Sequence, residues 1–287
     1  MMHPDERRLR TELAACYRIF DHLGWTELIY NHITVRLPES VTGGELHFLI
    51  NPFGLQFNEV TASNLVKIDL QGRVVGESEW KVNPAGFTLH SAIHGGIENA
   101  HCVMHTHTTA GSAVACSAAG LSTDNFYSAM LHGRVAYHEF EGITVHADEG
   151  PRVVRSIGNA QAVILRNHGL LSWGIDLPQA LAYLWTLQRA CDIQVAGASL
   201  GPTLRISEAV QKKASADAPR LRLQIVDDGE DVGRQPLDPI KVVHALLPLG
   251  MRMISRRSRR YAVPPGRRFG PTAGRHETDR RATTSDR

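Results

Sequence analysis

The stretch Cys102-Val103-Met104-His105-Thr106-His107-Thr108 places two histidines, two positions apart, at the end of an apolar run. The run predicts a β-strand over residues 102–106, followed by a helix of small residues over 109–119. Side chains two positions apart on a strand lie on one face, so His105 and His107 can direct both imidazole rings at one ion. A single His-x-His pattern is weak evidence for a metal site, and a third ligand is needed.

The third histidine follows another predicted strand. Residues 162–166 form an apolar run, and His168 comes directly after it in the segment Arg166-Asn167-His168-Gly169. Three neutral imidazoles that leave a coordination position open are typical of catalytic metal sites. We therefore predict that His105, His107 and His168 bind a divalent metal, with Zn²⁺ as the preferred ion and Fe²⁺ or Mn²⁺ as alternatives.

Three further histidines are candidates for the same site. His90 and His94 lie four positions apart on a helix predicted over residues 87–98, so they share a face and could bind a metal. We expect instead that one packs against the sheet and that the other caps or lines the site. His138 lies in Tyr137-His138-Glu139 and could act as a general base, because its unperturbed pKa is about 6.5. It could equally be a structural hydrogen-bond donor.

The rest of the chain predicts a mixed α and β order without a strict βαβ repeat. Two short alternating runs separated by Pro38 and the Gly43-Gly44 pair predict antiparallel strands. The expected helices cover residues 5–23, 61–65, 148–157 and 177–200, and the further expected strands cover 33–37, 46–50, 66–70 and 134–137.

Composition separates a folded part from a tail. The chain has 287 residues, 43% of them apolar, which is enough for one sizeable core and excludes a wholly disordered protein. Residues 251–287 contain 11 arginines, no lysine and three acidic residues, a formal charge of +8. The whole chain carries +2, which leaves −6 on residues 1–250.

We predict a domain over residues 1–215, followed by a linker and a disordered, arginine-rich tail over 216–287. The tail could bind an anionic partner such as nucleic acid, but its composition favours a solvated extension. Four cysteines without a Cys-x-x-Cys pair indicate a reducing compartment, and we expect the cytoplasm. Residues 1–12 are too polar for a signal peptide, and no stretch approaches the roughly 18 apolar residues of a membrane span.

Four blocks of this sequence, in the same order, resemble the class II aldolase/adducin family, and the resemblance spans roughly residues 8–210. The blocks are Asn83–His94, Val103–Thr108, Val135–Glu139 and Ile164–Leu170. The resemblance implies a three-layer α/β/α domain around a mainly antiparallel sheet, assembled as a homotetramer with active sites between subunits. In the sugar-phosphate aldolases of the family, Zn²⁺ is held by the histidines that match the three predicted ligands. Adducins have lost a ligand, whereas this chain keeps all three.

The departures from the aldolase pattern concern phosphate. The family's Ser-Ser-Glu-Trp block falls on residues 84–87, where Gly86 replaces the glutamate that is both ligand and base. The phosphate-binding Thr-Pro-Thr-Gly turn falls on Asn51-Pro52-Phe53-Gly54. At least three hydroxyls are lost, and a phosphate needs hydrogen-bond donors, so a phosphorylated sugar is not expected.

The resemblance also implies roles for residues outside the histidine triad. Asn31 and Gly54 are predicted to bind substrate. His138 and Tyr127 are the candidate catalytic residues, because the glutamate is missing. The match of Tyr127 rests on the short segment Asn125-Phe126-Tyr127-Ser128, which resembles the tyrosine that aldolases offer to the neighbouring subunit's site.

Three functional hypotheses remain. The leading one is a metal-dependent lyase that cleaves a carbon–carbon bond or decarboxylates a non-phosphorylated hydroxy- or oxo-acid, a small-molecule carbonyl substrate. The second is an Fe²⁺ oxygenase/decarboxylase of an aromatic 2-oxo acid on the same histidines, resembling members of the family from aminocoumarin antibiotic pathways. The third is a catalytically inactive, adducin-like interaction module.

Overall fold

The computed structural model describes residues 2–143 and 147–218 of the chain. The chain divides into two units, residues 1–251 and 252–287, and all described residues belong to the first unit. The predicted domain boundary after residue 215 lies three residues before the end of the described part and stays a prediction. The predicted linker and tail fall almost wholly outside the described residues.

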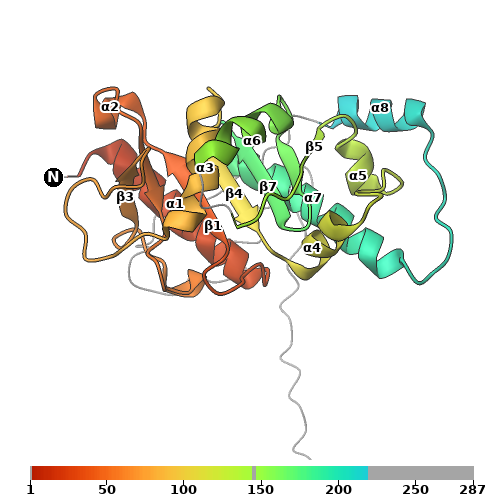
Figure 1. Cartoon of the computed structure of the whole chain (residues 1–287), viewed down its shortest axis with the longest axis horizontal. Coiled ribbons are helices and arrows are strands. Elements are labelled where there is room, and N and C mark those ends of the chain that lie inside the picture. Colours follow the sequence, from red (N-terminus) through yellow and green to blue (C-terminus); the bar gives the residue numbers. More distant parts are fainter. Residues whose placement is uncertain (1, 144–146, 219–287) are drawn as a thin grey trace, which may run out of the picture. The chain divides into compact units, whose positions relative to one another are not determined.

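A seven-stranded sheet forms the centre of the domain (Figure 1). Its strands are β1 (His32–Arg36), β2 (His47–Ile50), β3 (Val66–Asp69), β4 (Cys102–Thr106), β5 (Val135–His138), β6 (Ala162–Leu165) and β7 (Gly169–Gly174). They lie in the order β3-β2-β1-β4-β7-β6-β5, and only the β5–β6 pair is parallel. The mainly antiparallel sheet that the sequence predicts is confirmed.

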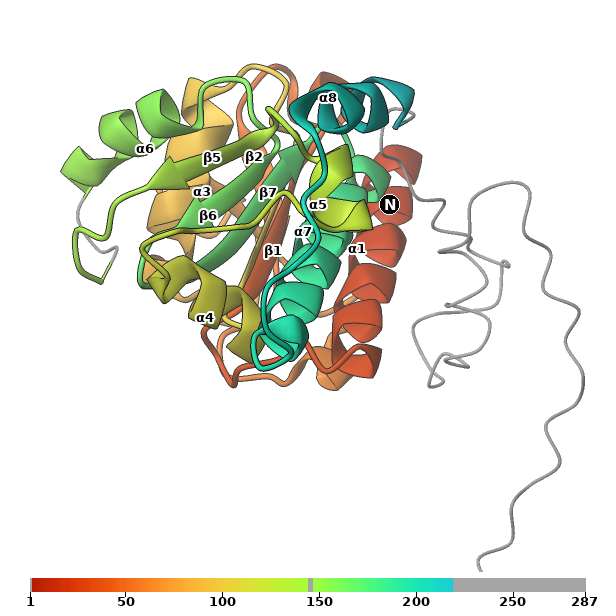
Figure 2. The same cartoon turned by 90° about the vertical axis from the view of Figure 1, so that its right-hand side faces the viewer.

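Helices cover both faces of the sheet, which confirms the three-layer architecture (Figure 2). One face carries α1 (Pro4–His22), α4 (Thr109–Cys116) and α7 (Leu177–Gly197), and the other carries α3 (Pro84–Gly96) and α6 (Gly150–Ile157). Two short helices extend the first face, because α5 (Phe126–Met130) packs on α7 and α8 (Glu208–Asp217) packs on α5. The other helical segments among the described residues are α2 (Glu39–Thr42) and two 3₁₀ turns, Phe57–Glu59 and Ala147–Glu149.

Apolar side chains fill both spaces between the sheet and its helices. Leu13 of α1 and Leu184 of α7 are fully buried against the first face of the sheet. Leu89 of α3 and Val153 of α6 pack with Val163 of β6 on the second face. The two central strands β4 and β7 are therefore buried on both faces, and their residues show a continuous run of burial.

One strand is absent from the sequence-based expectations and one expected helix does not form, each for an identifiable reason. The sequence does not predict β7, because the segment Gly169-Leu170-Leu171-Ser172-Trp173-Gly174 has glycine at both ends and lacks the alternation of a half-buried strand. The short helix expected over residues 61–65 is a turn. There the Thr61 N–H donates to Asn64 Oδ1, and the Asn64 N–H donates to Thr61 Oγ1, which replaces the first turn of a helix.

No helix in the described ranges has both the length and the apolar character needed to cross a membrane.

The turn between β6 and β7 brings His168 to the centre of the sheet. Leu165 pairs with Gly169, so only three residues connect the two strands. Asn167 has a φ of 54°, a left-handed conformation that asparagine tolerates better than most residues. An added Cβ at Gly169 would overlap the carbonyl oxygen of Thr106, so only glycine permits this approach of β7 to β4.

We expect Gly169→Ala to lower the free energy of unfolding by about 1–3 kcal/mol, because the new methyl group must displace the β4 backbone. Gly197→Ala is the control, since an added Cβ there has no neighbouring atom within 4 Å. Chemical denaturation of both variants checks this. Equal stability of the two would contradict the close approach.

Candidate metal centre

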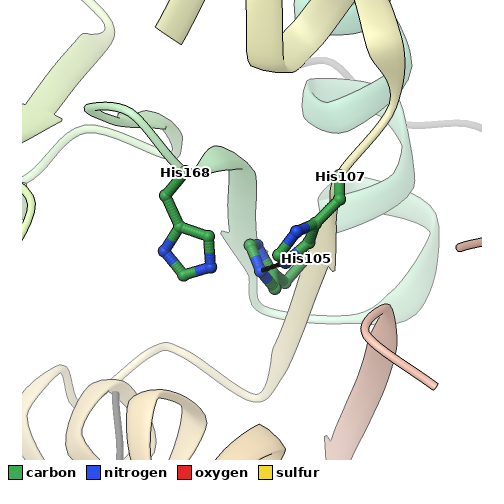
Figure 3. Close-up of side chains that lie close together, drawn as sticks. All are labelled: His105, His107 and His168. Atoms are coloured by element: carbon green, nitrogen blue, oxygen red, sulfur yellow. Dashed lines mark hydrogen bonds between the residues drawn. The ribbon is translucent and has the colours of Figure 1, made fainter. Parts of the chain in front are cut away.

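The structure brings the three predicted ligands together. His105 lies near the end of β4, His107 follows the strand, and His168 lies in the β6–β7 turn. One ring nitrogen from each histidine lies within 4.8 Å of those of the other two. The three ring centroids are 4.5 to 4.8 Å apart, and Figure 3 shows the rings gathered around one point. This arrangement fits a single divalent ion with three imidazole ligands.

Hydrogen bonding sets the tautomer of His105 in favour of metal binding. Its Nδ1 lies 2.9 Å from the carbonyl oxygen of Leu170, which can only accept, so Nδ1 carries the proton. The Nε2 atom of the neutral ring then has a lone pair directed at the centre. Metal-binding histidines commonly donate their other N–H to a carbonyl group in this way. Without a metal, Nε2 of His107, 2.7 Å away, donates to this lone pair.

Asn31 positions the backbone of His107. Its Oδ1 accepts the His107 N–H at 2.9 Å, and its Nδ2 donates to the Trp25 carbonyl at 2.9 Å. The side chain is 1% exposed, so these internal bonds hold the chain just beyond β4 in place. The substrate-binding role of Asn31 stays a prediction, and the contacts in this structure are those of a residue that orients a ligand.

Burial keeps the ligand histidines neutral. It lowers the pKa of His168 to about 4, and the neighbouring rings of His107 and His138 contribute to this shift. Burial lowers the pKa of His105 well below its usual value, and it lowers the pKa of His107 against an opposing effect of Glu27. A neutral imidazole is the form that binds a metal, so these rings need not lose a proton at neutral pH.

The triad lies in a cleft of about 350 Å³, called the metal cleft below. Its described lining residues are Tyr30, His32, Asn83, Gly86, Leu89, His105, His107, Phe140, Gly142, Ile143, Asn167 and His168. This set contains no lysine, arginine, aspartate, glutamate, serine or threonine. Apart from the imidazoles, the polar groups are two side-chain amides and one phenol, and the rim is apolar.

The second predicted substrate residue lies beside this cleft. Gly54 and Asn31 line a small recess that shares His32, Asn83 and Gly86 with the metal cleft. Gly54 has a φ of 93°, so the turn that places it there requires glycine. Its role in binding substrate stays a prediction.

His138 lies at the end of β5 but not in the lining of the metal cleft. Its Nδ1 lies 3.0 Å from Ser156 Oγ, and its Nε2 lies 3.3 Å from Glu149 Oε1. The Ser156 hydroxyl donates to the carbonyl of Arg152, so its oxygen is left to accept from the ring. Both ring nitrogens are thus engaged, and the catalytic role of His138 stays a prediction.

Tyr127 lies on α5 and lines a different pocket, together with Gln188 and Trp185. Its ring packs edge-on against Trp185 with a centroid distance of 5.5 Å. Within one chain it does not reach the described lining of the metal cleft. This placement agrees with a residue offered to a neighbouring copy, and that role stays a prediction.

His90 and His94 face the sheet, where they share the hydroxyl of Thr34 on β1. His94 Nδ1 lies 2.6 Å from the Ala100 carbonyl and must donate to it. Burial lowers the pKa of His94 to about 3, so the ring is neutral and its Nε2 accepts from Thr34 Oγ1 at 2.7 Å. Thr34 then accepts from His90 Nδ1 at 2.7 Å. Neither histidine is among the described residues that line the metal cleft, although the sequence predicts that one of them caps or lines it.

His32 is the residue that sequence reasoning missed. Its ring lines the metal cleft and contacts the rings of both His105 and His90, with centroid distances of 5.3 and 4.4 Å. Burial lowers its pKa to about 3. A sequence signal exists, because His32 directly follows Asn31, which the sequence analysis predicts to bind substrate. Only the pairing of His32 with His105 in the sheet shows that these two histidines lie close together.

The neutral, buried histidines make the metal-free protein less stable in acid. The pKa values of His32, His94 and His168 are about 3, 3 and 4 in the folded protein. An unfolded histidine has a pKa of about 6.5, so between these values the unfolded chain binds more protons. We expect the free energy of unfolding to fall as the pH is lowered from about 6.5 to about 5, as urea denaturation would measure. A rise over this interval would contradict the assignment.

We expect His107→Ala to abolish tight binding of a divalent metal, because only two of the three imidazoles remain. His22→Ala is the control, since His22 is exposed at the end of α1. Elemental analysis after dialysis against a weak chelator checks both variants. Full metal content in His107→Ala would show that the triad is not the site.

Comparison with known proteins gives the family. The model described as Class II Aldolase and Adducin N-terminal domain matches residues 11–195. Alpha-adducin of Rattus norvegicus is 47% identical over 193 residues, which are 66% of this chain and 26% of the adducin. The crystal structure of an aldolase II superfamily protein from Pseudomonas syringae is 41% identical, with a TM-score of 0.71, and the match covers 76% of this chain and 87% of that one.

A structure of L-fuculose 1-phosphate aldolase from Glaciozyma antarctica is 30% identical with a TM-score of 0.66, and the match covers 74% of this chain and 82% of that one. The residues that the family model matches include all seven strands of the sheet and the three clustered histidines. The protein belongs to the class II aldolase and adducin family.

Proposed function

We propose that this protein is a metal-dependent lyase that cleaves or decarboxylates a non-phosphorylated hydroxy- or oxo-acid. The observation that carries the proposal is the cluster of three histidine nitrogens within 4.8 Å at the metal cleft. The tautomer of His105 is already set for binding, and burial keeps the rings neutral. A divalent ion held there would act as a Lewis acid that polarises a bound carbonyl group.

The lining of the cleft supports a substrate without phosphate. A phosphate group is bound by cationic side chains or by several N–H and O–H donors. The described lining offers no lysine, arginine, serine or threonine, and its polar side chains besides histidine are Tyr30, Asn83 and Asn167. The matched L-fuculose 1-phosphate aldolase acts on a phosphorylated sugar by its name. We propose that this chain shares the fold of that protein but takes a different substrate.

Aromatic side chains would orient the substrate and exclude water. The Tyr30 ring lies 6.0 Å from the His107 ring, and the Phe140 ring lies 6.2 Å from the His168 ring, measured between centroids. Tyr30 and Phe140 are more than half exposed, so both are available to a ligand. Removing water from the cleft strengthens electrostatic interactions inside it.

Proton transfer needs groups beyond the triad. We propose His138, which lies at the end of β5 outside the described lining of the metal cleft, and Tyr127, which would act in the cleft of a neighbouring copy. The second role requires a homotetramer with sites between subunits, which we propose together with a cytoplasmic location. Zn²⁺ is the preferred metal, and Fe²⁺ or Mn²⁺ are the alternatives.

One observation favours a second candidate. The described lining of the metal cleft contains no carboxylate, so the ligands there are all neutral. An all-histidine centre can hold Fe²⁺, and an Fe²⁺ oxygenase/decarboxylase of an aromatic 2-oxo acid is therefore the alternative. The apolar rim formed by Phe140 and Ile143 would suit an aromatic substrate. An inactive interaction module, as the similarity to part of alpha-adducin suggests, is the remaining outcome of the test.

The test starts from protein purified without chelators and without oxygen. We expect close to one divalent metal per chain and turnover of a non-phosphorylated 2-hydroxy or 2-oxo acid, measured as product formation and as dioxygen uptake. Phosphorylated sugars should not react, because the described cleft offers their phosphate no cationic lysine or arginine and no serine or threonine hydroxyl.

His107→Ala is the matched control, since it should lose metal and turnover together. Turnover without dioxygen uptake supports the lyase, whereas uptake that depends on Fe²⁺ supports the oxygenase. Absence of bound metal, or full activity in His107→Ala, would contradict both enzymes and leave the interaction module.

A further inference from the structure

The histidine cluster continues beyond the triad through His32. The His32 ring lies against His105 on one side and His90 on the other, so the imidazoles form a continuous row from the metal cleft into the layer beneath α3. His32 also lines the metal cleft, although the residue is only 8% exposed. It is therefore placed beside the metal position without being open to bulk water.

The hydrogen bonds of His32 resemble those of the ligand His105. Its Nδ1 lies 3.2 Å from the Tyr30 carbonyl, which can only accept, so Nδ1 carries the proton of the neutral ring. Its Nε2 then has a free lone pair, and this buried atom has no hydrogen-bond partner among the described residues. A buried polar atom without a protein partner is rare, and such an atom often faces a bound ion or water molecule.

The chain makes room for this ring at Gly86. Gly86 lies in the first turn of α3, and its φ is not positive, so its backbone conformation is open to other residues. An added Cβ would lie 3.1 Å from His32 Nδ1 and 3.2 Å from Cε1, which is closer than ordinary packing. Backbone conformation therefore does not explain the glycine, whereas the position of the His32 ring does.

We propose that His32 is a fourth histidine ligand of the metal centre, bound through its Nε2. The proposal rests on the proposed function, because it assumes a metal ion at His105, His107 and His168. His32 is outside the group whose nitrogens already lie within 4.8 Å, so its ring must turn toward the centre. That movement breaks no hydrogen bond at Nε2, and the Nδ1 bond of 3.2 Å is at the long end of its range.

A fourth imidazole has a consequence for the choice of metal. Four histidines complete the coordination of a tetrahedral Zn²⁺ ion, whereas a six-coordinate Fe²⁺ or Mn²⁺ ion keeps two positions for the two oxygens of a hydroxy- or oxo-acid. If His32 binds the metal, the preference for Zn²⁺ stated above would be reversed, and Fe²⁺ or Mn²⁺ would be favoured in the working protein.

The first test needs no substitution. X-ray absorption spectroscopy of the wild-type protein loaded with Fe²⁺ or Mn²⁺ counts imidazole ligands from their multiple-scattering signal. Four imidazoles per metal is the expected result, and three would overturn the proposal while leaving the three-histidine centre intact. Failure of the wild-type protein to bind any of the metals would instead refute the proposed function itself.

The second test compares two buried histidines, of which only one lines the metal cleft. His32 and His90 both have a buried Nε2 without a partner among the described residues, but only His32 lines the metal cleft. We expect His32→Phe to weaken metal binding roughly tenfold or more in a competition titration, because loss even of groups that only support metal ligands has an effect of this size. We expect His90→Phe to leave metal binding nearly unchanged.

Equal affinities in the two variants would contradict the proposal. Thermal unfolding of both metal-free variants separates loss of the fold from loss of a ligand. If His32→Phe does not fold, His32→Leu and the imidazole count in the wild-type protein still decide the question.

Discussion

The antiparallel pairing of β4 with β7 is the constraint on which the site depends. It places the β6–β7 turn beside the end of β4, so His168 meets His105 although 62 residues separate them in the sequence. The same pairing supplies the Leu170 carbonyl that holds the proton on Nδ1 of His105. The approach requires glycine at position 169, where any side chain would overlap the β4 backbone. The pairing of β4 with β7 thus brings the candidate ligands together and sets the tautomer of His105.

Burial of the histidine rings is a second constraint on the site. A charged imidazole is costly in a dry interior, so the rings at this site are neutral and each needs a defined tautomer. Backbone carbonyls provide it for His105 and His32 directly, and for His90 through Thr34 and His94. The Nε2 lone pairs of His105 and His32 therefore belong to neutral rings with defined tautomers. Such rings suit metal binding better than acid–base catalysis, in which a group must change charge.

The cleft combines this metal position with an apolar rim. The described lining has no lysine, arginine, serine or threonine, and Phe140 and Ile143 expose apolar side chains to solvent. An exposed apolar rim around a polar centre is typical of a binding surface. Membership of the family therefore gives the fold of this chain but leaves its reaction open, because the reaction depends on the residues of the site.

The sequence by itself determined the family and the mixed fold, and it predicted the three candidate ligands, because His105, His107 and His168 lie at strand ends, where local periodicity can be read. It also predicted most helices and strands, since their apolar spacing is local. Only the tertiary structure decided what lies beside the ligands. It showed Asn31 bonded to the His107 backbone, and it brought the His32 ring against Gly86, 54 residues later. Such contacts depend on strand register and helix packing, which join distant segments and leave no periodic signal in the sequence.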